Sequence, residues 1–167
     1  MQKKKLNIPV TTLFILVHTV ALVGFYPLFT VEGLILALVS TPIFGMAITV
    51  VYHRYLTHKG FKTSTFMRRA LSIWGMLAGE GPPLIWVANH LWHHSDSDQE
   101  NDAHSPKHGF WHSHIGWMMK ADEKGALNDL FMKYVPQLQR DPFMRMLNKT
   151  YIWWHVAVGF LLFGIGY

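Results

Sequence analysis

Three histidines close together in the chain form the pattern HxxHH. His90, His93 and His94 stand at positions i, i+3 and i+4, which share one face of an α-helix. Three imidazole rings on one face can converge on a site without rearrangement of the backbone, and core packing offers no comparable reason for this spacing. The pattern therefore predicts that these side chains bind metal.

A second pair of histidines, His53 and His58, stands in the hexapeptide HRYLTH at the end of an apolar run. An ideal α-helix turns by ~100° per residue, so rings five positions apart point about 140° away from each other. Such a pair cannot chelate one ion directly. The two rings could instead reach two different ions, or the helix could unwind near Gly60. Taken alone, the pair is equally compatible with a chance pairing at a membrane surface.

The other residue types limit the kind of metal. The chain contains no cysteine, which excludes disulfides, thiolate zinc sites and iron–sulfur clusters. Imidazole suits iron, zinc, copper and nickel. The sequence has neither the HExxH motif of zinc peptidases nor the Glu-x-x-His pair of soluble carboxylate di-iron proteins. A histidine-rich site at a membrane surface is suited to oxygen chemistry on a lipid substrate.

Two further groups of side chains follow the histidine trio. Acidic residues follow it closely, among them Asp96, Asp98 and Asp102. Their carboxylates are predicted to accept the second imidazole N–H of metal ligands, which fixes tautomer and ring orientation; the alternative is a solvated acidic turn. The histidines that recur every four residues are His104, His108 and His112. They could line one helix face, although direct ligation by them is the less favoured interpretation.

Two apolar runs are long enough to cross a membrane. No Asp, Glu, Lys or Arg occurs from Leu6 to Val31 or from Gly33 to Tyr52, and about 20 helical residues cross a hydrocarbon core. We expect membrane-spanning helices at residues 8–29 and 32–52. Basic residues flank this hairpin at both outer ends, so the positive-inside rule places those ends in the cytoplasm. The net charge of +5 is attributed to topology and anionic lipid, and nucleic acid is not expected as a partner.

The rest of the chain is expected to form a helical cap and the start of another span. Residues 53–149 are too many for a structureless loop, and their apolar stretches at 70–79 and 82–92 suit interfacial or cap helices. The expected fold is all-α and integral to the membrane. It has a transmembrane hairpin over residues 1–52, a cytoplasmic cap over 53–149 and the start of a third transmembrane helix over 150–167.

Three segments resemble the first two histidine boxes and the following segment of the delta-9, acyl-CoA desaturase-like branch of the membrane fatty acid desaturases. They are HRYLTH at residues 53–58, WVANHLWHH at 86–94 and SDSDQENDAHSPKHGFWHSHIGW at 95–117. Their order and separation also agree with the family. The resemblance implies a multi-pass membrane enzyme whose cytoplasmic cap holds two iron ions. Such an enzyme uses dioxygen to introduce a cis double bond, at the delta-9 position, into a long acyl chain.

The resemblance also implies roles for individual residues. The iron ligands would be His53, His58, His90, His93 and His94. Trp86 would line the bent acyl tunnel, and Lys107 and His108 would bind the head group of the substrate. The substrate would be an acyl-CoA or a membrane acyl-lipid, with electrons from a ferredoxin-, rubredoxin- or cytochrome-type donor. The active site would face the cytoplasm from a bacterial inner membrane.

The chain departs from the family pattern at several points. Leu91 stands where relatives commonly carry arginine, and Ala88 stands where acyl-CoA enzymes often carry a positive residue. These changes favour an acyl-lipid or an acyl-carrier protein over acyl-CoA. The third histidine box and the fourth span are absent from the 167 residues. Because five ligands do not satisfy two irons, we expect the chain to be a fragment that is inactive alone.

Two other functions are compatible with the motifs. A membrane di-iron hydroxylase of alkanes, sterols or carotenoids could use similar boxes, although Arg54 and the segment SDSDQENDAHSP favour a desaturase. The second alternative is a non-catalytic, histidine-rich membrane protein that binds metal. A transporter would carry polar groups along a path within its spans, whereas nine of the eleven histidines lie in the expected cap.

Overall fold

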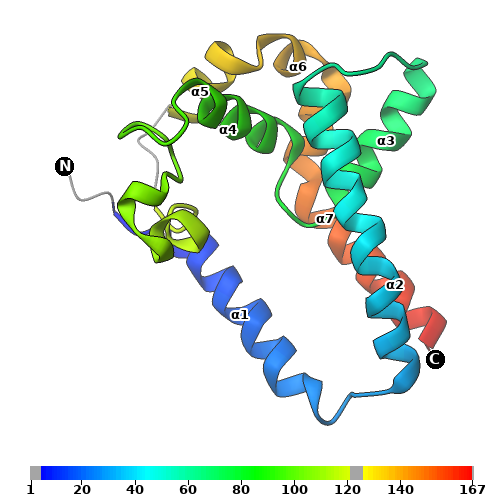
Figure 1. The fold of residues 1–167 in the computed structure, drawn as a ribbon. Helices are drawn as coiled ribbons and strands as arrows, with labels where there is room; N and C mark the ends of the chain where they lie inside the picture. Colours follow the sequence, from blue (N-terminus) through cyan, green and yellow to red (C-terminus); the bar gives the residue numbers. More distant parts are fainter. Residues whose placement is uncertain (1–4, 121–125, 167) are drawn as a thin grey trace. The chain divides into compact units, whose positions relative to one another are not determined.

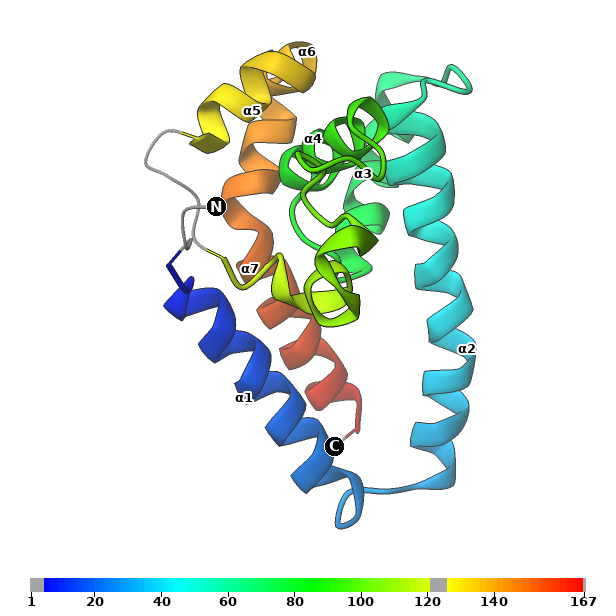
Figure 2. The ribbon, with the colours of Figure 1, turned by 60° about the vertical axis from the view of Figure 1, so that its left-hand side comes forward.

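The computed structural model describes residues 5–120 and 126–166. These residues are helical apart from turns and an isolated bridge between Leu6 and Lys120, and they contain no strand. Figures 1 and 2 show the elements in chain order. They are α1 (Ile8–Phe25), α2 (Val31–Ala47), η1 (Ile48–Thr57), α3 (Thr65–Leu77), α4 (Pro83–Ser95), η2 (Pro106–His108), η3 (His112–Gly116), α5 (Ala126–Tyr134), α6 (Pro136–Arg140) and α7 (Pro142–Gly166). The expected all-α fold is confirmed.

Two helical runs in the described part of the chain are long and apolar enough to cross a membrane, Ile8–Phe25 and Val31–Thr57. The second is α2 continued without a break by η1 (Figure 2). Their large apolar side chains are mostly exposed in the isolated chain, as expected for surfaces whose solvent is lipid. Both predicted spans therefore correspond to helices, the first ending earlier than predicted and the second ending later.

The chain divides into two compact units. The first unit comprises Met1–Ser40 and Trp92–Leu127, and the second comprises Thr41–Leu91 and Asn128–Tyr167. The division falls inside α2 and α4, which are both continuous helices. The apolar C-terminal segment predicted to start at residue 150 belongs to α7, which begins earlier, at Pro142. The membrane-based division into hairpin, cap and third span stays a prediction.

In the first unit, the start of α1 is joined to the segment that follows η3. The Asn7 side chain caps α1 by accepting the Val10 N–H at 3.3 Å. The Asn7 N–H donates to the Met119 carbonyl at 2.8 Å, and Leu6 pairs with Lys120. These contacts hold the residues around Met119 at the N-terminal end of α1.

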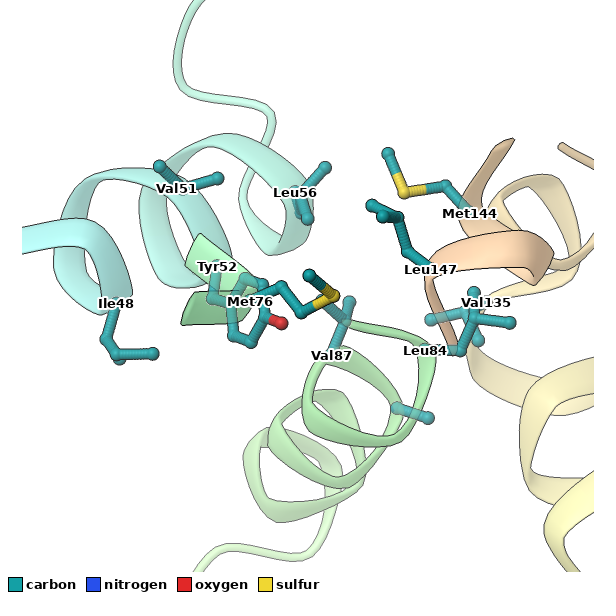
Figure 3. Packing of buried hydrophobic residues seen from close by; sticks show 11 residues of the cluster. Ile48, Val51, Tyr52, Leu56, Met76, Leu84, Val87, Val135, Met144 and Leu147 are labelled. Carbon is teal, nitrogen blue, oxygen red and sulfur yellow. The ribbon is translucent and has the colours of Figure 1, made fainter. Parts of the chain in front are cut away.

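The second unit is built around a core of apolar side chains from η1, α3, α4 and α7, together with Val135 between α5 and α6 (Figure 3). Its buried members are Ile48, Val51, Tyr52, Leu56, Met76, Leu84, Val87, Ala88, Val135, Met144 and Leu147. In Figure 3, the side chains of Tyr52, Met76 and Val87 approach one another from η1, α3 and α4. Burying these side chains stabilises the unit by roughly 1.5–3 kcal/mol for each large one. The core thereby fixes η1 and the first part of α4 against each other.

Polar contacts set the start of α4 within the same unit. The Tyr52 hydroxyl donates to the Gly81 carbonyl at 3.0 Å, and the Gly81 N–H donates to the Tyr151 hydroxyl at 3.1 Å. The first turn of α4 is capped from α7, because the Leu84 N–H donates to the Asn148 side-chain oxygen at 3.2 Å. Thus η1, the turn before α4 and α7 are joined by hydrogen bonds as well as by the core.

Gly75 allows α3 to approach η1 closely. A Cβ at this position would lie 2.8 Å from Cδ1 of the Tyr52 ring and 3.2 Å from Cβ of Val51. We predict that Gly75→Ala destabilises the protein by ~1–3 kcal/mol, because the buried ring must shift in a packed core. The change is measured as a melting temperature in detergent, with size-exclusion chromatography reporting the folded fraction after heating. Gly45→Ala is the matched control, since nothing lies within 4 Å of its added Cβ; equal melting temperatures for the two variants would contradict the prediction.

Candidate metal centre

The first histidine pair lies in a π-helix, and this changes its geometry. In η1 the His58 N–H donates to the His53 carbonyl at 3.1 Å, an i→i+5 bond. A π-helix is wound more widely than an α-helix, so residues five apart lie closer together around its axis than they do in an α-helix. The His53 and His58 ring centroids are 4.5 Å apart. The prediction that the two rings diverge and cannot approach one ion is therefore wrong, because it assumed α-helical geometry.

His90 of α4 joins this pair within the second unit. Its ring centroid lies 4.9 Å from that of His53 and 5.9 Å from that of His58. Ring nitrogens of the three residues lie within 4.8 Å of one another. Two nitrogens bound to one ion at about 2.1 Å are separated by at most about 4.2 Å, so small ring rotations suffice for shared ligation. The structure brings these three predicted ligands together, and metal binding by them stays a prediction.

The remaining two predicted ligands lie in the last turn of α4. His94 follows His90 by one helical turn and shares its face of the helix. The His93 ring instead groups with Asp102 and His104. The three rings of HxxHH therefore do not converge on one site as predicted, because positions i+3 and i+4 flank position i on opposite sides of the helix axis. The single HxxHH motif can therefore supply ligands in two directions.

Trp86 packs directly on His90. The two rings stack with centroids 4.7 Å apart and planes inclined by 28°, and the Tyr52 ring lies 5.4 Å from the indole. The Trp86 indole N–H donates to the Glu80 carboxylate at 3.0 Å. The role of Trp86 in lining an acyl tunnel is not tested by these contacts. The sequence analysis missed Glu80, because no local pattern relates it to an indole six residues later.

His93 has its own carboxylate partner in the first unit. Its Nδ1 lies 2.9 Å from Oδ2 of Asp102, whose side chain is buried. The Asp102 carboxylate also accepts the backbone N–H groups of Asp98 at 3.1 Å and His104 at 3.2 Å. Burial raises the pKa of Asp102, but these backbone and imidazole hydrogen bonds outweigh it and hold the pKa below its usual range. Asp102 is therefore an ionised acceptor that orients the His93 ring.

The other two predicted carboxylates have different surroundings. Asp96 accepts the indole N–H of Trp92 at 3.1 Å. Asp98, at φ 57°, contributes its backbone N–H to Asp102. The Asp102 carboxylate contacts the predicted ligand His93. Roles of Asp96 and Asp98 beside a metal stay predictions.

The His104 ring packs on the His93 ring. Its ring stacks on the His93 ring at 4.4 Å with planes inclined by 24°, and the Trp117 ring lies 5.3 Å from it. Burial and the nearby His93 ring lower the pKa of His104, which keeps it neutral near pH 7. His93, Asp102 and His104 form a second group with donor atoms within 4.8 Å.

The histidines spaced by four residues do not share a helix. His104 lies in a loop, His108 ends the short turn η2, and His112 begins η3. The idea that they line one helix face is wrong, because Gly109, at φ 93°, ends η2 between them. The Lys107 side chain is exposed. The backbone N–H of Lys107 donates to the Ser105 hydroxyl, which caps η2. Head-group binding by Lys107 and His108 stays a prediction.

Two of these rings hold the loop that carries Asp102. His108 Nε2 donates to the Glu100 carbonyl at 3.2 Å, and His112 Nε2 donates to the Ala103 carbonyl at 3.1 Å. His112 Nδ1 then accepts from the Lys120 ammonium at 2.9 Å. Burial and Lys120 lower the pKa of His112 and so favour this neutral tautomer. These histidines act as supports for the loop in the described structure.

The described residues thus define a class: an all-helical protein with apolar spans and clustered histidines that fit a metal. The chain belongs to the family described as fatty acid desaturase, whose profile matches residues 26–167. The family that the histidine motifs resemble is therefore confirmed.

Individual relatives agree with this assignment. The chain is 38% identical to delta-9 acyl-lipid desaturase 2 of Arabidopsis thaliana over 152 residues, covering 90% of this chain and 48% of that protein. It is 35% identical to sn-1 stearoyl-lipid 9-desaturase of Anabaena variabilis over 166 residues, covering 98% of this chain and 60% of that protein. It is 33% identical to hex-5-enoyl-[acyl-carrier protein] acetylenase of Moorena producens (strain JHB) over 159 residues, covering 87% of this chain and 47% of that protein. The chain spans about half the length of these relatives.

Proposed function

We propose that this protein is a dioxygen-dependent membrane desaturase that introduces a cis double bond, at the delta-9 position, into a long acyl chain. The observation that carries the proposal is the approach of His53, His58 and His90 in the second unit. Their donor atoms are all imidazole nitrogens, a donor type that suits iron. Bound iron would supply the redox chemistry that an unactivated methylene requires, since that group has no acidic proton and no leaving group.

The ligands divide between two ions in this proposal. His53, His58 and His90 bind one iron, with His94 added from the same face of α4. His93 binds the second through Nε2, because its Nδ1–H is directed at Asp102.

Other residues in the proposal position the substrate. Trp86 stacks on His90, so an acyl chain that runs along the indole passes beside the first metal position. The Glu80 carboxylate accepts the indole N–H of Trp86 and so holds the ring in place. Lys107 is exposed and cationic and is assigned, with His108, to the head group. A rigid apolar wall of this kind determines which carbon pair reaches the metal.

The proposal also names the carrier of the acyl chain, the electron donor and the membrane in which the protein lies. Names of the relatives include acyl-lipid and acyl-[acyl-carrier protein] substrates, and the neutral Ala88 and Leu91 favour these two carriers over acyl-CoA. Electrons come from a ferredoxin-, rubredoxin- or cytochrome-type protein. The site faces the cytoplasm from a multi-pass protein of the bacterial inner membrane, on the positive-inside argument.

Product analysis tests the proposal. The complete coding sequence is expressed in a desaturase-deficient host with added saturated fatty acid, and the lipids are analysed by gas chromatography with mass spectrometry. We expect a cis-9 alkene that disappears without oxygen. An alcohol at the same carbons would indicate a hydroxylase, and bound zinc without any oxygen-dependent product would indicate a non-catalytic metal-binding protein. Either result would overturn the proposal.

A further inference from the structure

Two large aromatic side chains of the first unit are unusually exposed. Phe110 and Trp111, directly before η3, are 81% and 62% exposed. The Phe110 ring stacks on His114 at 5.5 Å. Apolar side chains that gather on a surface mark a site for a partner, whereas single ones do not. We call the adjacent residues Phe110 and Trp111 the aromatic patch.

The aromatic patch is held at the N-terminal end of α1. Hydrogen-bonded turns run from η3 to Lys120, with the Trp117 N–H donating to His112 at 3.0 Å and the Lys120 N–H donating to Trp117 at 3.3 Å. The Asn7 N–H then donates to Met119, directly before α1 begins. All of these contacts lie within the first unit. The patch is therefore fixed relative to one end of a helix that can cross a membrane.

The end of a transmembrane helix lies at the level of the lipid head groups. Aromatic rings are enriched at that level, where tryptophan places its apolar body in the acyl region and its N–H towards water. We propose that the aromatic patch inserts into the head-group–acyl boundary on the membrane face where α1 begins. The partner is the lipid surface itself. This inference rests on the membrane insertion of α1 that is part of the proposed function.

Insertion of the patch would connect the membrane surface to the metal ligands of the first unit. His112 follows Trp111 directly and donates to Ala103, between Asp102 and His104. Asp102 in turn contacts His93. Lipid that holds Phe110 and Trp111 would thus hold the loop that orients His93. The patch acts as a second anchor, additional to the spans.

Site-directed spin labelling tests the inference, and the absence of native cysteine makes single labels possible. The full 167-residue chain carrying F110C, W111C, V20C or S97C is labelled and reconstituted into phosphatidylcholine–phosphatidylglycerol vesicles. Power saturation compares access of oxygen, which concentrates in lipid, with access of a water-soluble nickel chelate. F110C retains Trp111 and W111C retains Phe110, so each variant keeps half of the aromatic pair. V20C lies within α1, and S97C is at an exposed polar position.

We expect the labels at positions 110 and 111 to lie about 5–10 Å below the phosphate level, between the deep V20C label and the water-exposed S97C label. Nickel access at 110 and 111 equal to that at S97C would overturn the inference. So would spin–spin broadening that disappears on dilution with unlabelled chain, because a second copy would then cover the patch. Nickel access at V20C would instead show that α1 does not span, which refutes the membrane placement in the proposed function.

Discussion

Replacing His90 by alanine is expected to lower the ferrous-iron affinity of the first proposed site by more than about 100-fold. Loss of an outer-shell partner alone typically costs 10–100-fold in metal affinity, and loss of a ligand removes a bond as well. Alanine is the best helix former, so α4 should persist. The measurement is an anaerobic iron titration against a competing chelator, with the iron-to-chain ratio determined by mass spectrometry.

A matched control and a double variant sharpen this prediction. His114→Ala removes an exposed ring that stacks on Phe110, outside both candidate metal groups, and should leave iron affinity unchanged. Ligands of one ion act as a unit, so His53→Ala with His90→Ala should lose little more than either single change. Wild-type affinity at both sites in His90→Ala would contradict the assignment. Fully additive losses would show that His53 and His90 bind different ions.

Replacing Asp102 is expected to have the second largest effect. Asp102→Asn should lower iron affinity at the His93 site by about 10–100-fold, because the charged acceptor that orients the ring is lost. Asp102→Ala should also destabilise the first unit by ~1–3 kcal/mol or more, since the N–H groups of Asp98, His104 and His93 lose their acceptor. Iron titration measures the first effect and thermal melting the second.

The neighbouring carboxylates provide the controls for Asp102. Asp96→Asn preserves an acceptor for the Trp92 indole, and Asp98→Asn preserves a residue that tolerates positive φ. Both variants should retain iron affinity within about twofold. If Asp98→Asn weakens iron binding as much as Asp102→Asn does, then the acidic segment acts through its overall charge. The specific hydrogen bond to His93 would then not be the cause.

Local sequence patterns were sufficient to predict the helices in much of the chain. The uncharged runs predicted the two helices that can span a membrane, and the HxxHH spacing predicted a helix, which is α4, although its rings belong to two groups of donors and not to one. Both predictions depend on residues near one another in sequence, where the geometry of a regular helix applies. The resemblance of the histidine boxes was equally local, and it identified the family correctly.

Other features depended on contacts between distant residues. The α-helical assumption separated His53 from His58, but η1 is a π-helix in the structure and brings the rings together. Nothing in HRYLTH distinguishes the two helix types. The approach of His90 to this pair required the close packing of α3 on η1 at Gly75 and the hydrogen bonds that set the start of α4.

The sequence by itself determined which residue types are available, which segments are helical and apolar, and to which family the chain belongs. The tertiary structure decided which of three equivalent carboxylates meets His93, that Glu80 holds Trp86, and that His108 and His112 support a loop. The physical reason is that helix formation and membrane partition depend on neighbouring residues. A metal site requires donor atoms to meet within a few ångströms, and only the packing of separate elements brings them there.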